Sequence, residues 1–235
     1  SYTAINEKLK ELDLISLDKV KAISYNRVFE AKDKKGKELI IKVTGEEIRA
    51  RIESAANYFL SQHGKLVQIV TPGYSPHPIA YGNVYLTVQE KVKDKAKYDI
   101  HYYMAALAML HAHGEEVLPR NFLPEFKVHP FGKIIEGVNS PSKYQHLQSL
   151  YQGIAYGLEN SPEKRAIHSD AKWDNLDLGK ALDLEGMRIG DPSIDLSLYL
   201  AQSGEPVEEW INYLQTYLSV FQSETGQLYN IDTVT

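Results

Sequence analysis

Strand-like and helix-like hydrophobic patterns occupy separate parts of this chain, and this separation limits the folds that it can adopt. Short strand-like segments occur early, at residues 27–31, 38–43 and 84–88. Segments with helical spacing dominate later, at residues 102–113, 144–158, 193–202 and 207–221. Strands and helices that are segregated in this way are typical of α+β proteins. We therefore predict an α+β chain with a small strand-rich part, residues 1–90, and a larger, mainly helical part, residues 91–235.

The first two predicted strands flank a lysine-rich stretch, residues 32–37, that contains Gly36. Glycine readily adopts the turn conformations that join antiparallel strands, so we expect a hairpin here. A helix should follow and begin near Gly45, because Thr44 and Glu47 have the spacing of a capping box. The buried stripe expected for this helix repeats at helical spacing and consists of Ile48, Ile52, Ala55 and Phe59.

Two further helix boundaries are predicted in the second part. Gly114 should end the helix at residues 102–113, because glycine commonly follows the last helical turn. Asp191 and Pro192 should begin the helix at residues 193–202, as its cap and its first residue. Stretches without regular patterns, expected to be loops, lie at residues 71–81, 115–142 and 161–189.

The composition argues against several classes of protein. The chain of 235 residues has no cysteine and a formal net charge of −5. Without cysteine there is no disulfide framework, thiolate nucleophile or zinc–thiolate site, which limits metal ligands to oxygen and imidazole groups. The negative charge argues against a nucleic acid partner. The longest apolar run, residues 102–110, is too short to span a bilayer, and no signal-like segment opens the chain, so we expect a cytoplasmic protein without a membrane partner.

Three histidines, His101, His111 and His113, lie close together in the sequence and raise the question of a metal site. Their spacing matches no strong zinc pattern, which normally pairs ligands at defined intervals. We therefore expect structural or exposed roles for these three side chains.

A group of oxygen-bearing side chains lies within residues 168–185. Asp170 is followed five positions later by Asn175, and Asp183 comes after a short apolar piece. Transfer of a phosphoryl group needs a carboxylate that orients and deprotonates the attacking hydroxyl. It also needs hard oxygen ligands that hold magnesium against nucleotide phosphates. Asp170 suits the first role, and Asn175 and Asp183 suit the second.

The phosphates of a nucleotide also need a nearby cation. Lys42 ends a predicted strand, so its ammonium group could reach a cleft between the two parts. A carboxylate on the next helix would hold this lysine in place, and Glu53 is the candidate. Glu53 falls on the flank of the predicted buried stripe, where it could face a cleft without being buried.

Six segments, in order along the chain, match the motifs of one known family. Its catalytic loop, His-x-Asp-x-x-x-x-Asn, is matched by His168, Asp170 and Asn175. The other matches are a phosphate-covering loop at 24–29, a lysine-pairing helix with Glu53, Leu60, His63 and Gly64, a Leu-His helix end at 110–111, a metal-binding segment at 182–185 and a Gly-Asp-Pro-x-x-Asp-Leu motif at 190–196. Over residues 24–200 the chain thus resembles the aminoglycoside phosphotransferase and choline kinase-like family, which has a protein-kinase-like fold.

The resemblance implies a bilobal fold with a nucleotide-binding lobe, residues 1–90, and a catalytic and acceptor-binding lobe, residues 91–235. It implies ATP and Mg2+ as cofactors and a small-molecule hydroxyl acceptor, such as an aminoglycoside, an amino alcohol or a sugar. Asp170 would be the catalytic residue, Asp195 would brace its loop, and His168 would be structural. The implied nucleotide-binding residues are Lys42, Glu53, Ser24, Asn26, Gln89 and Lys91, and the implied metal ligands are Asn175, Asp183 and Glu185. Gln89 and Lys91 belong to an expected hinge, residues 89–92, whose backbone would read the adenine.

Two departures from the family pattern keep a second hypothesis open. The loop at residues 24–27 has no glycine, and only seven residues separate Asn175 from Asp183, fewer than the family usually has. A nucleotide-binding scaffold that has lost turnover would also fit these features. A protein kinase is less well supported, because the chain lacks Asp-Phe-Gly at Asp183 and lacks Ala-Pro-Glu. The sequence does not choose between ATP and GTP or among the acceptors, and it gives no oligomeric state.

Overall fold

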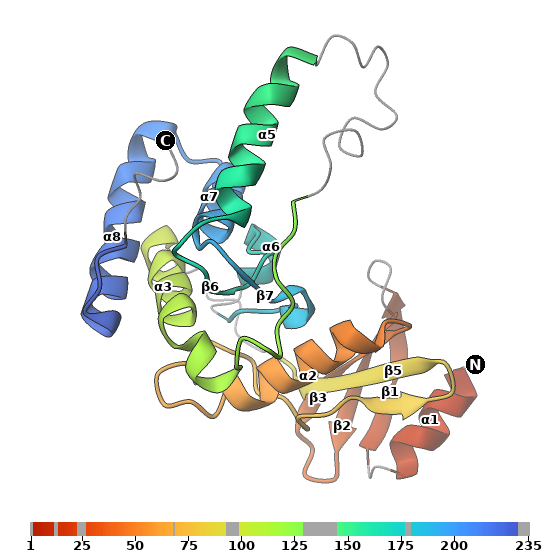
Figure 1. Ribbon diagram of the computed structural model, residues 1–235. Coiled ribbons are helices and arrows are strands. Elements are labelled where there is room, and N and C mark those ends of the chain that lie inside the picture. The colour runs from red at the N-terminus through yellow and green to blue at the C-terminus, as the bar shows by residue number, and fades with distance from the viewer. Residues whose placement is uncertain are drawn as a thin grey trace.

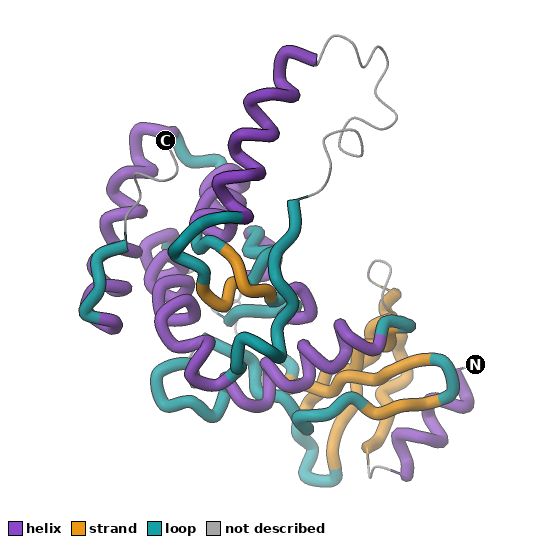
Figure 2. Tube along the Cα trace, viewed as in Figure 1, coloured by secondary structure: helices purple, strands orange, loops and turns teal. Residues whose placement is uncertain are grey.

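The structure, a computed structural model, describes residues 2–11, 14–22, 27–67, 69–92, 99–128, 145–176 and 180–229. Its first part is an antiparallel sheet with two helices, and its second part is mainly helical (Figure 1). Figure 2 shows the same division, with the strands gathered in the first part except for one short pair. The predicted bilobal α+β fold is confirmed.

The sheet has the strand order β1-β2-β3-β5-β4, and all neighbouring strands are antiparallel. The strands are β1 (Leu14–Ala22), β2 (Arg27–Asp33), β3 (Glu38–Thr44), β4 (Ile79–Tyr81) and β5 (Val84–Glu90). The β2–β3 hairpin is present as predicted, with Gly36 in its turn at a φ of 79°. Asp33 Oδ1 accepts hydrogen bonds from the backbone N–H groups of Lys35 and Lys37 and fixes this turn. The sequence patterns did not predict β1 or helix α1 (Tyr2–Glu11), and β4 lies in a stretch that was expected to be a loop.

The side chains of β3 alternate between the two faces of the sheet, as the pleat of a strand requires. Leu39, Ile41 and Val43 are buried in a small core that also contains Phe29. Lys42 therefore projects from the opposite face, where helix α2 (Glu47–Leu60) lies. Strand alternation thus places the ammonium group of Lys42 between the sheet and this helix.

Helix α2 begins at Glu47, and the predicted capping box does not form. Glu46 takes the N-cap position, and its side chain makes no capping hydrogen bond. Thr44 is still paired in β3, opposite Tyr85, and its Oγ1 accepts from the backbone N–H of Glu46 at 3.2 Å. The Glu47 carboxylate accepts from the Tyr85 hydroxyl at 3.0 Å. Thr44 therefore remains part of β3, and Glu47 bonds to Tyr85 of β5, so these two residues do not form the predicted helix start.

The buried face of α2 differs from the predicted stripe. Ile52 and Ala55 are buried, but Ile48 and Phe59 are 61% and 42% exposed. Glu53, which was expected on an exposed flank, is only 1% exposed. The helix packs against both β5 and the turn η2 (Leu184–Gly186). Its buried face is therefore determined by contacts with both parts of the chain.

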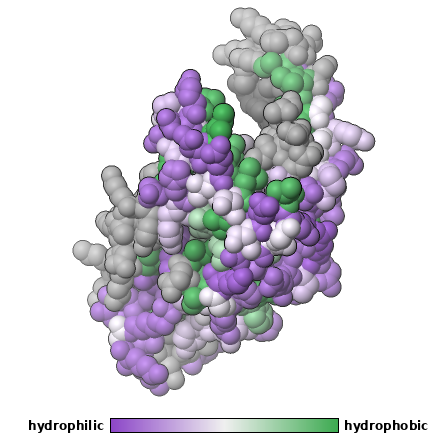
Figure 3. Space-filling model, turned by 90° about the vertical axis from the view of Figure 1, so that its left-hand side faces the viewer, coloured by the Kyte–Doolittle hydropathy of each residue, from purple (hydrophilic) through white to green (hydrophobic). Residues whose placement is uncertain are grey.

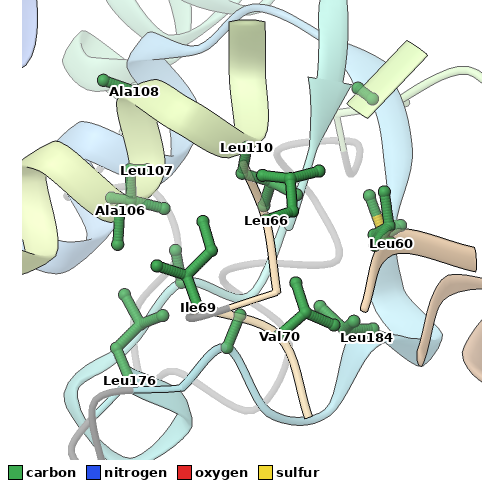
Figure 4. Packing of buried hydrophobic residues seen from close by; sticks show 14 of the residues in the cluster. Leu60, Leu66, Ile69, Val70, Ala106, Leu107, Ala108, Leu110, Leu176 and Leu184 are labelled. Atoms are coloured by element: carbon green, nitrogen blue, oxygen red, sulfur yellow. The ribbon is translucent and has the colours of Figure 1, made fainter. Parts of the chain in front are cut away.

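The second part contains the helices α3 (Ile100–Val117), α5 (Gln145–Glu159), α6 (Trp173–Leu176), α7 (Ser193–Ser203) and α8 (Val207–Thr225). Its core also includes residues from α2 and the turn after it. Leu60 and Leu66 belong to the same buried cluster as Leu107 and Leu110 of α3 (Figure 4). Apolar packing therefore attaches α2 to the helical part, and the core does not divide at residue 90.

Helix α3 continues to Val117, so Gly114 does not end it as predicted. A Cβ atom at Gly114 would lie 3.0 Å from the Cβ of Ala166, which is in strand β6 (Arg165–Ile167). This distance is tighter than ordinary van der Waals contact. Glycine avoids this close contact between α3 and β6, and local sequence alone cannot distinguish such a packing role from a helix stop.

Residues 161–189, expected to be loop-like, contain two strands of three residues each, β6 and β7 (Arg188–Gly190). Strands this short carry no readable period-two pattern. They pair antiparallel, with Ile167 opposite Arg188, and bring the segment after β6 beside the segment before β7. Asp191 follows β7, and its Oδ1 accepts from the backbone N–H of Ser193, the first residue of α7, at 2.8 Å. Pro192 takes the N-cap position that was predicted for Asp191, so the helix begins one residue later than expected.

Within the described ranges, no helix is both long enough and apolar enough to cross a bilayer. The face drawn in Figure 3 is largely hydrophilic, with smaller hydrophobic groups between the polar residues.

Candidate active site

The centre of the candidate site is Lys42, whose ammonium group contacts two carboxylates. One is Glu53 of α2, and the other is Asp183 Oδ1, which lies 2.6 Å from Lys42 Nζ. Lys42 comes from the sheet, Glu53 from the helix beside it, and Asp183 from the helical part of the chain. The three charges therefore meet where the two parts of the molecule join.

Charge and burial compete in setting the protonation of these groups. Burial alone would lower the pKa of Lys42, but the charges of Glu53 and Asp183 outweigh it and hold that pKa above its ordinary value. Burial alone would raise the pKa of Asp183, but Lys42 outweighs it and holds that pKa below its ordinary value. At neutral pH Lys42 is therefore a cation and Asp183 is an anion.

A second contact fixes the buried Glu53 carboxylate. Its Oε2 accepts a hydrogen bond of 3.0 Å from Thr87 Oγ1 of β5. One helical turn further along α2, Asn57 Nδ2 donates to Gln89 Oε1 at 2.7 Å. These contacts hold α2 against β5, so the orientation of Glu53 towards Lys42 is set by the sheet itself.

Asp183 occupies an unusual backbone conformation, with φ of 61° and ψ of 44°. Non-glycine residues rarely adopt this left-handed region, although aspartate is among those that tolerate it best. The preceding residue is fixed on both sides: the Leu182 N–H donates to Asn175 O at 2.8 Å, and Leu182 O accepts from His168 Nε2 at 2.7 Å. His168 thus has the structural role expected for it and positions the segment that carries Asp183.

Asp195, on α7, holds the loop that contains Asp170. It is completely buried, and its carboxylate accepts from the backbone N–H groups of His168 at 2.6 Å and Ser169 at 2.8 Å. His111 Nε2 of α3 lies 3.0 Å from the same carboxylate. Ser169 has a φ of 61°, and its hydroxyl donates to the carbonyl of Gly186. Asp195 therefore supports a strained turn directly before Asp170.

Asp170 is half-exposed, so its carboxylate is accessible to an incoming molecule. Asn175 Nδ2 donates to Asp170 twice, to its backbone carbonyl at 2.9 Å and to Oδ2 at 3.0 Å. Lys172 Nζ lies 3.0 Å from the same Oδ2. The hydrogen bond to Asp170 holds the pKa of Lys172 above its ordinary value. The amide of Asn175 thus faces Asp170 through nitrogen, which leaves its oxygen for another partner.

Sequence reasoning missed Lys172, although it lies inside the motif that identified Asp170. The sequence signal that could have identified Lys172 is its position, two residues after the proposed base Asp170. Asp170 and Asp183 both act electrostatically on this ammonium group. Lys172 is therefore a second cation beside the candidate catalytic carboxylate.

Glu185 is a further carboxylate close enough to Asp183 for their charges to interact. Arg49 Nη1 lies 3.3 Å from Glu185 Oε1. Burial, followed by the charges of Asp183 and Glu53, holds the pKa of Glu185 above its ordinary value. Three carboxylates thus gather around Lys42, and a divalent cation at Asp183 and Glu185 would relieve their mutual repulsion.

Two of the remaining predicted site residues, Gln89 and Lys91, lie in the described part of the chain and bond to other partners. Ser24 and Asn26 lie outside the described residues. The Gln89 side chain is bonded to Asn57, and Lys91 Nζ lies 2.9 Å from Glu30 Oε2. The Lys91 N–H donates to Glu38 O at 2.9 Å. Among the described contacts, neither side chain reaches Lys42, and the adenine-reading role of the hinge backbone stays a prediction.

Comparison with known proteins gives a match in structure alone. No protein-family model and no curated protein matches the sequence. The structure of amicoumacin kinase hAmiN in complex with AMP-PNP, Ca2+ and Ami aligns with a TM-score of 0.69 at 17% identity, over 95% of this chain and 78% of that chain. Macrolide 2'-phosphotransferase type I gives 0.61 at 13% identity, over 99% and 85%. Choline kinase LicA from Streptococcus pneumoniae gives 0.58 at 16% identity, over 100% and 95%.

The chain has the fold of the protein-kinase-like phosphotransferases. The resemblance that the motifs predicted is thereby confirmed at the level of the fold. Within this fold, the cluster of Lys42, Glu53 and Asp183 lies at the junction of the two lobes, with Asp170 and Asn175 linked to it through Leu182.

Proposed function

We propose that this chain is an ATP-dependent small-molecule kinase, which transfers the γ-phosphoryl group to a hydroxyl of its acceptor. The observation that carries the proposal is the convergence of Lys42, Glu53 and Asp183, beside an accessible Asp170. A fixed cation, hard oxygen ligands and an accessible carboxylate are the groups that phosphoryl transfer requires. The phosphotransferases with the same fold support the reaction class.

The donor set fits magnesium. Asp183 and Glu185 offer carboxylate oxygens, and the amide of Asn175 has its oxygen available because its nitrogen donates to Asp170. These are hard ligands of the kind that Mg2+ prefers. When bound there, Mg2+ would neutralise charge on the nucleotide phosphates.

Lys42 would bind the α- and β-phosphates, and Glu53 would keep its ammonium group in position. In this structure Lys42 compensates the charge of Asp183 directly. In our proposal the phosphates take over this role when the nucleotide binds. Because Glu53 is buried and bonded to Thr87, it would hold Lys42 in place during this exchange.

Asp170 would orient the acceptor hydroxyl and take its proton as the oxygen attacks the γ-phosphorus. The new bond joins the acceptor oxygen to phosphorus, and the bond between the γ-phosphorus and the β,γ-bridging oxygen breaks, so that ADP leaves. Lys172, beside Asp170, would stabilise the negative charge of the transferring group. Asp195 would act only by positioning, through the backbone of His168 and Ser169.

The acceptor class is proposed from charge and from the neighbours. Structures with this fold were solved with streptomycin and with spectinomycin, and another is a choline kinase. These compounds carry hydroxyl groups together with cationic nitrogen. A chain with a net charge of −5 suits cationic acceptors, so we propose an aminoglycoside, an amino alcohol or a related sugar.

A screen for ADP release tests the proposal, with ATP and Mg2+ and a panel of aminoglycosides, amino alcohols, sugars and nucleosides. The key variant is Asp170→Asn. The matched control is Asp99→Asn, because Asp99 caps α3 through Tyr102 N–H and asparagine caps helices equally well. We expect at least one compound to stimulate ADP release by the parent chain and the control, and not by Asp170→Asn. Nucleotide binding without transfer to any compound would favour a scaffold that has lost turnover.

A further inference from the structure

A second cluster consists of two histidines and a glutamate, residue types that can act as metal ligands. His63 is in the turn after α2, while His113 and Glu116 are one helical turn apart on α3. Glu116 Oε2 lies 3.1 Å from His63 Nε2, and Glu116 Oε1 lies 2.9 Å from His113 Nδ1. Two imidazole nitrogens therefore approach one carboxylate, although the two histidines are 50 positions apart in the sequence.

The spacing of these atoms is close to that of a metal site. Bonds of about 2.0–2.1 Å in tetrahedral geometry place neighbouring ligand atoms roughly 3.3 Å apart. The potential ligand atoms of His63, His113 and Glu116 all lie within 4.8 Å of one another. The two imidazole rings are close and stacked, with centroids 5.4 Å apart. Small side-chain adjustments would bring three ligand atoms around one ion.

A fourth residue orients one of the ligands. Glu224 Oε2 of α8 lies 2.8 Å from His113 Nε2 and also pairs with Lys65. With a proton held on Nε2 by Glu224, the nitrogen of His113 that can bind a metal is Nδ1, which faces Glu116. A carboxylate behind a histidine ligand is the usual supporting arrangement in zinc sites.

One side of the cluster is open to solvent, because its residues differ in exposure. The His113 side chain is 6% exposed, whereas that of Glu116 is 55% exposed. An ion held by the two histidines and Glu116 would therefore keep a position for water. Three protein ligands and one water satisfy a tetrahedral ion.

We propose that His63, His113 and Glu116 form a binding site for a divalent transition metal, with zinc as the ion that best fits two imidazoles and a carboxylate. The site differs in position and ligand type from the oxygen-ligand cluster around Asp183, so it does not depend on the proposed kinase activity. His63 follows α2, the helix that carries Glu53, and the other two ligands lie on α3. Metal binding would therefore stabilise the packing of α2 against α3.

The other two histidines considered in the sequence have structural partners instead. His101 Nδ1 lies 2.7 Å from Thr216 Oγ1, and His111 bridges Tyr217 and Asp195. His113 finds its partner ligand in His63, which is distant in sequence. Spacing along the chain could not reveal this pair.

Zinc titration of the nucleotide-free chain, after chelator treatment and dialysis, tests the site by calorimetry and by thermal unfolding. We expect one zinc ion per chain and a rise in melting temperature on binding. His63→Gln and Glu116→Gln should each weaken zinc binding by more than 100-fold, while Glu224→Gln should weaken it by about 10–100-fold, as expected for a supporting residue. Glu116 is exposed, so its substitution tests the site even if a histidine variant does not fold.

Two controls separate this site from other histidines and from the proposed active site. His77→Gln removes an exposed histidine outside the cluster, and Asp183→Asn alters the Lys42 cluster. Both should bind zinc as tightly as the parent chain. Failure of the parent chain to bind zinc, or unchanged zinc affinity in His63→Gln and Glu116→Gln, would overturn the proposal.

Discussion

Lys42 Nζ lies 2.6 Å from Asp183 Oδ1, although 141 positions separate the two residues in the sequence. The contact joins strand β3 of the first lobe to the segment before η2 in the second lobe. Lys42 also contacts the buried Glu53, so one cation links the sheet, helix α2 and the second lobe. The proposed site is therefore also a structural connection between the lobes.

Lys42→Met should destabilise the chain, because it leaves the Glu53 carboxylate buried without its cation. Breaking a buried ion pair from one side costs about 3–5 kcal/mol. Urea unfolding at pH 7 should show a loss of about 3 kcal/mol in the free energy of unfolding. The double variant Lys42→Met with Glu53→Gln removes both charges and should recover most of this loss. An equal loss in both variants would show that the uncompensated carboxylate is not the cause.

Asp195→Asn should lower both stability and turnover. Asparagine replaces one carboxylate oxygen by an NH2 group, which cannot accept a hydrogen bond. Both carboxylate oxygens of Asp195 are now in contact with the backbone N–H groups of His168 and Ser169 or with His111. Hydrogen bonds to a charged group contribute about 1.5–3 kcal/mol, so we expect a loss of at least this size. Because Asp195 is completely buried and its carboxylate bonds the loop backbone and His111, kcat should fall while the KM for ATP stays nearly unchanged. A variant with raised KM and normal kcat would argue against this positioning role.

Gly114→Ala should destabilise the chain even though alanine favours helices by about 1 kcal/mol. The new Cβ would lie 3.0 Å from the Cβ of Ala166, and overpacking of this kind costs about 1–3 kcal/mol. Gly157→Ala in α5 is the matched control, because its Cβ meets nothing within 4 Å and the substitution should stabilise. Adding Ala166→Gly to Gly114→Ala should restore stability. Thermal unfolding of the four proteins measures these effects.

Glu185→Gln should change how stability depends on pH. Burial and the charges of Asp183 and Glu53 raise the pKa of Glu185 in the folded chain. The folded state therefore binds this proton more tightly than the unfolded state, and stability falls as the pH rises from the unfolded pKa, about 4.3, through the raised folded value. The variant lacks this loss, so it should gain stability relative to the parent at pH 7 and not at pH 4. Urea unfolding at both pH values checks the sign, and an advantage at pH 4 alone would contradict it.

The sequence predicted those parts of the candidate site whose chemistry lies within short motifs. Asp170, Asn175 and Asp183 stand in one segment, and the strand–helix order brought Lys42 and Glu53 into the prediction. The burial of Glu53 was missed, because it depends on Thr87 of β5, which local spacing does not show. Lys172 was missed because a lysine beside a carboxylate in sequence looks like an ordinary surface charge.

The fold could be predicted from the sequence where hydrophobic patterns were long. Prediction failed where the patterns were short or where tertiary packing determined the structure. The hairpin around Gly36 and the helices of the second lobe follow from periodicity. Strands β6 and β7 are three residues each and show no period. Gly114 looked like a helix end, since the close approach of Ala166 exists only in three dimensions.

The most direct test of the account is the rate of phosphoryl transfer from labelled ATP to an acceptor found in the screen, compared between the parent chain and Asp170→Asn. If Asp170 takes the proton of the acceptor hydroxyl, kcat should fall on the order of 10²–10⁴-fold, with little change in the KM for ATP. The Asp99→Asn control should keep the parent rate. Transfer by Asp170→Asn at the parent rate would contradict the account.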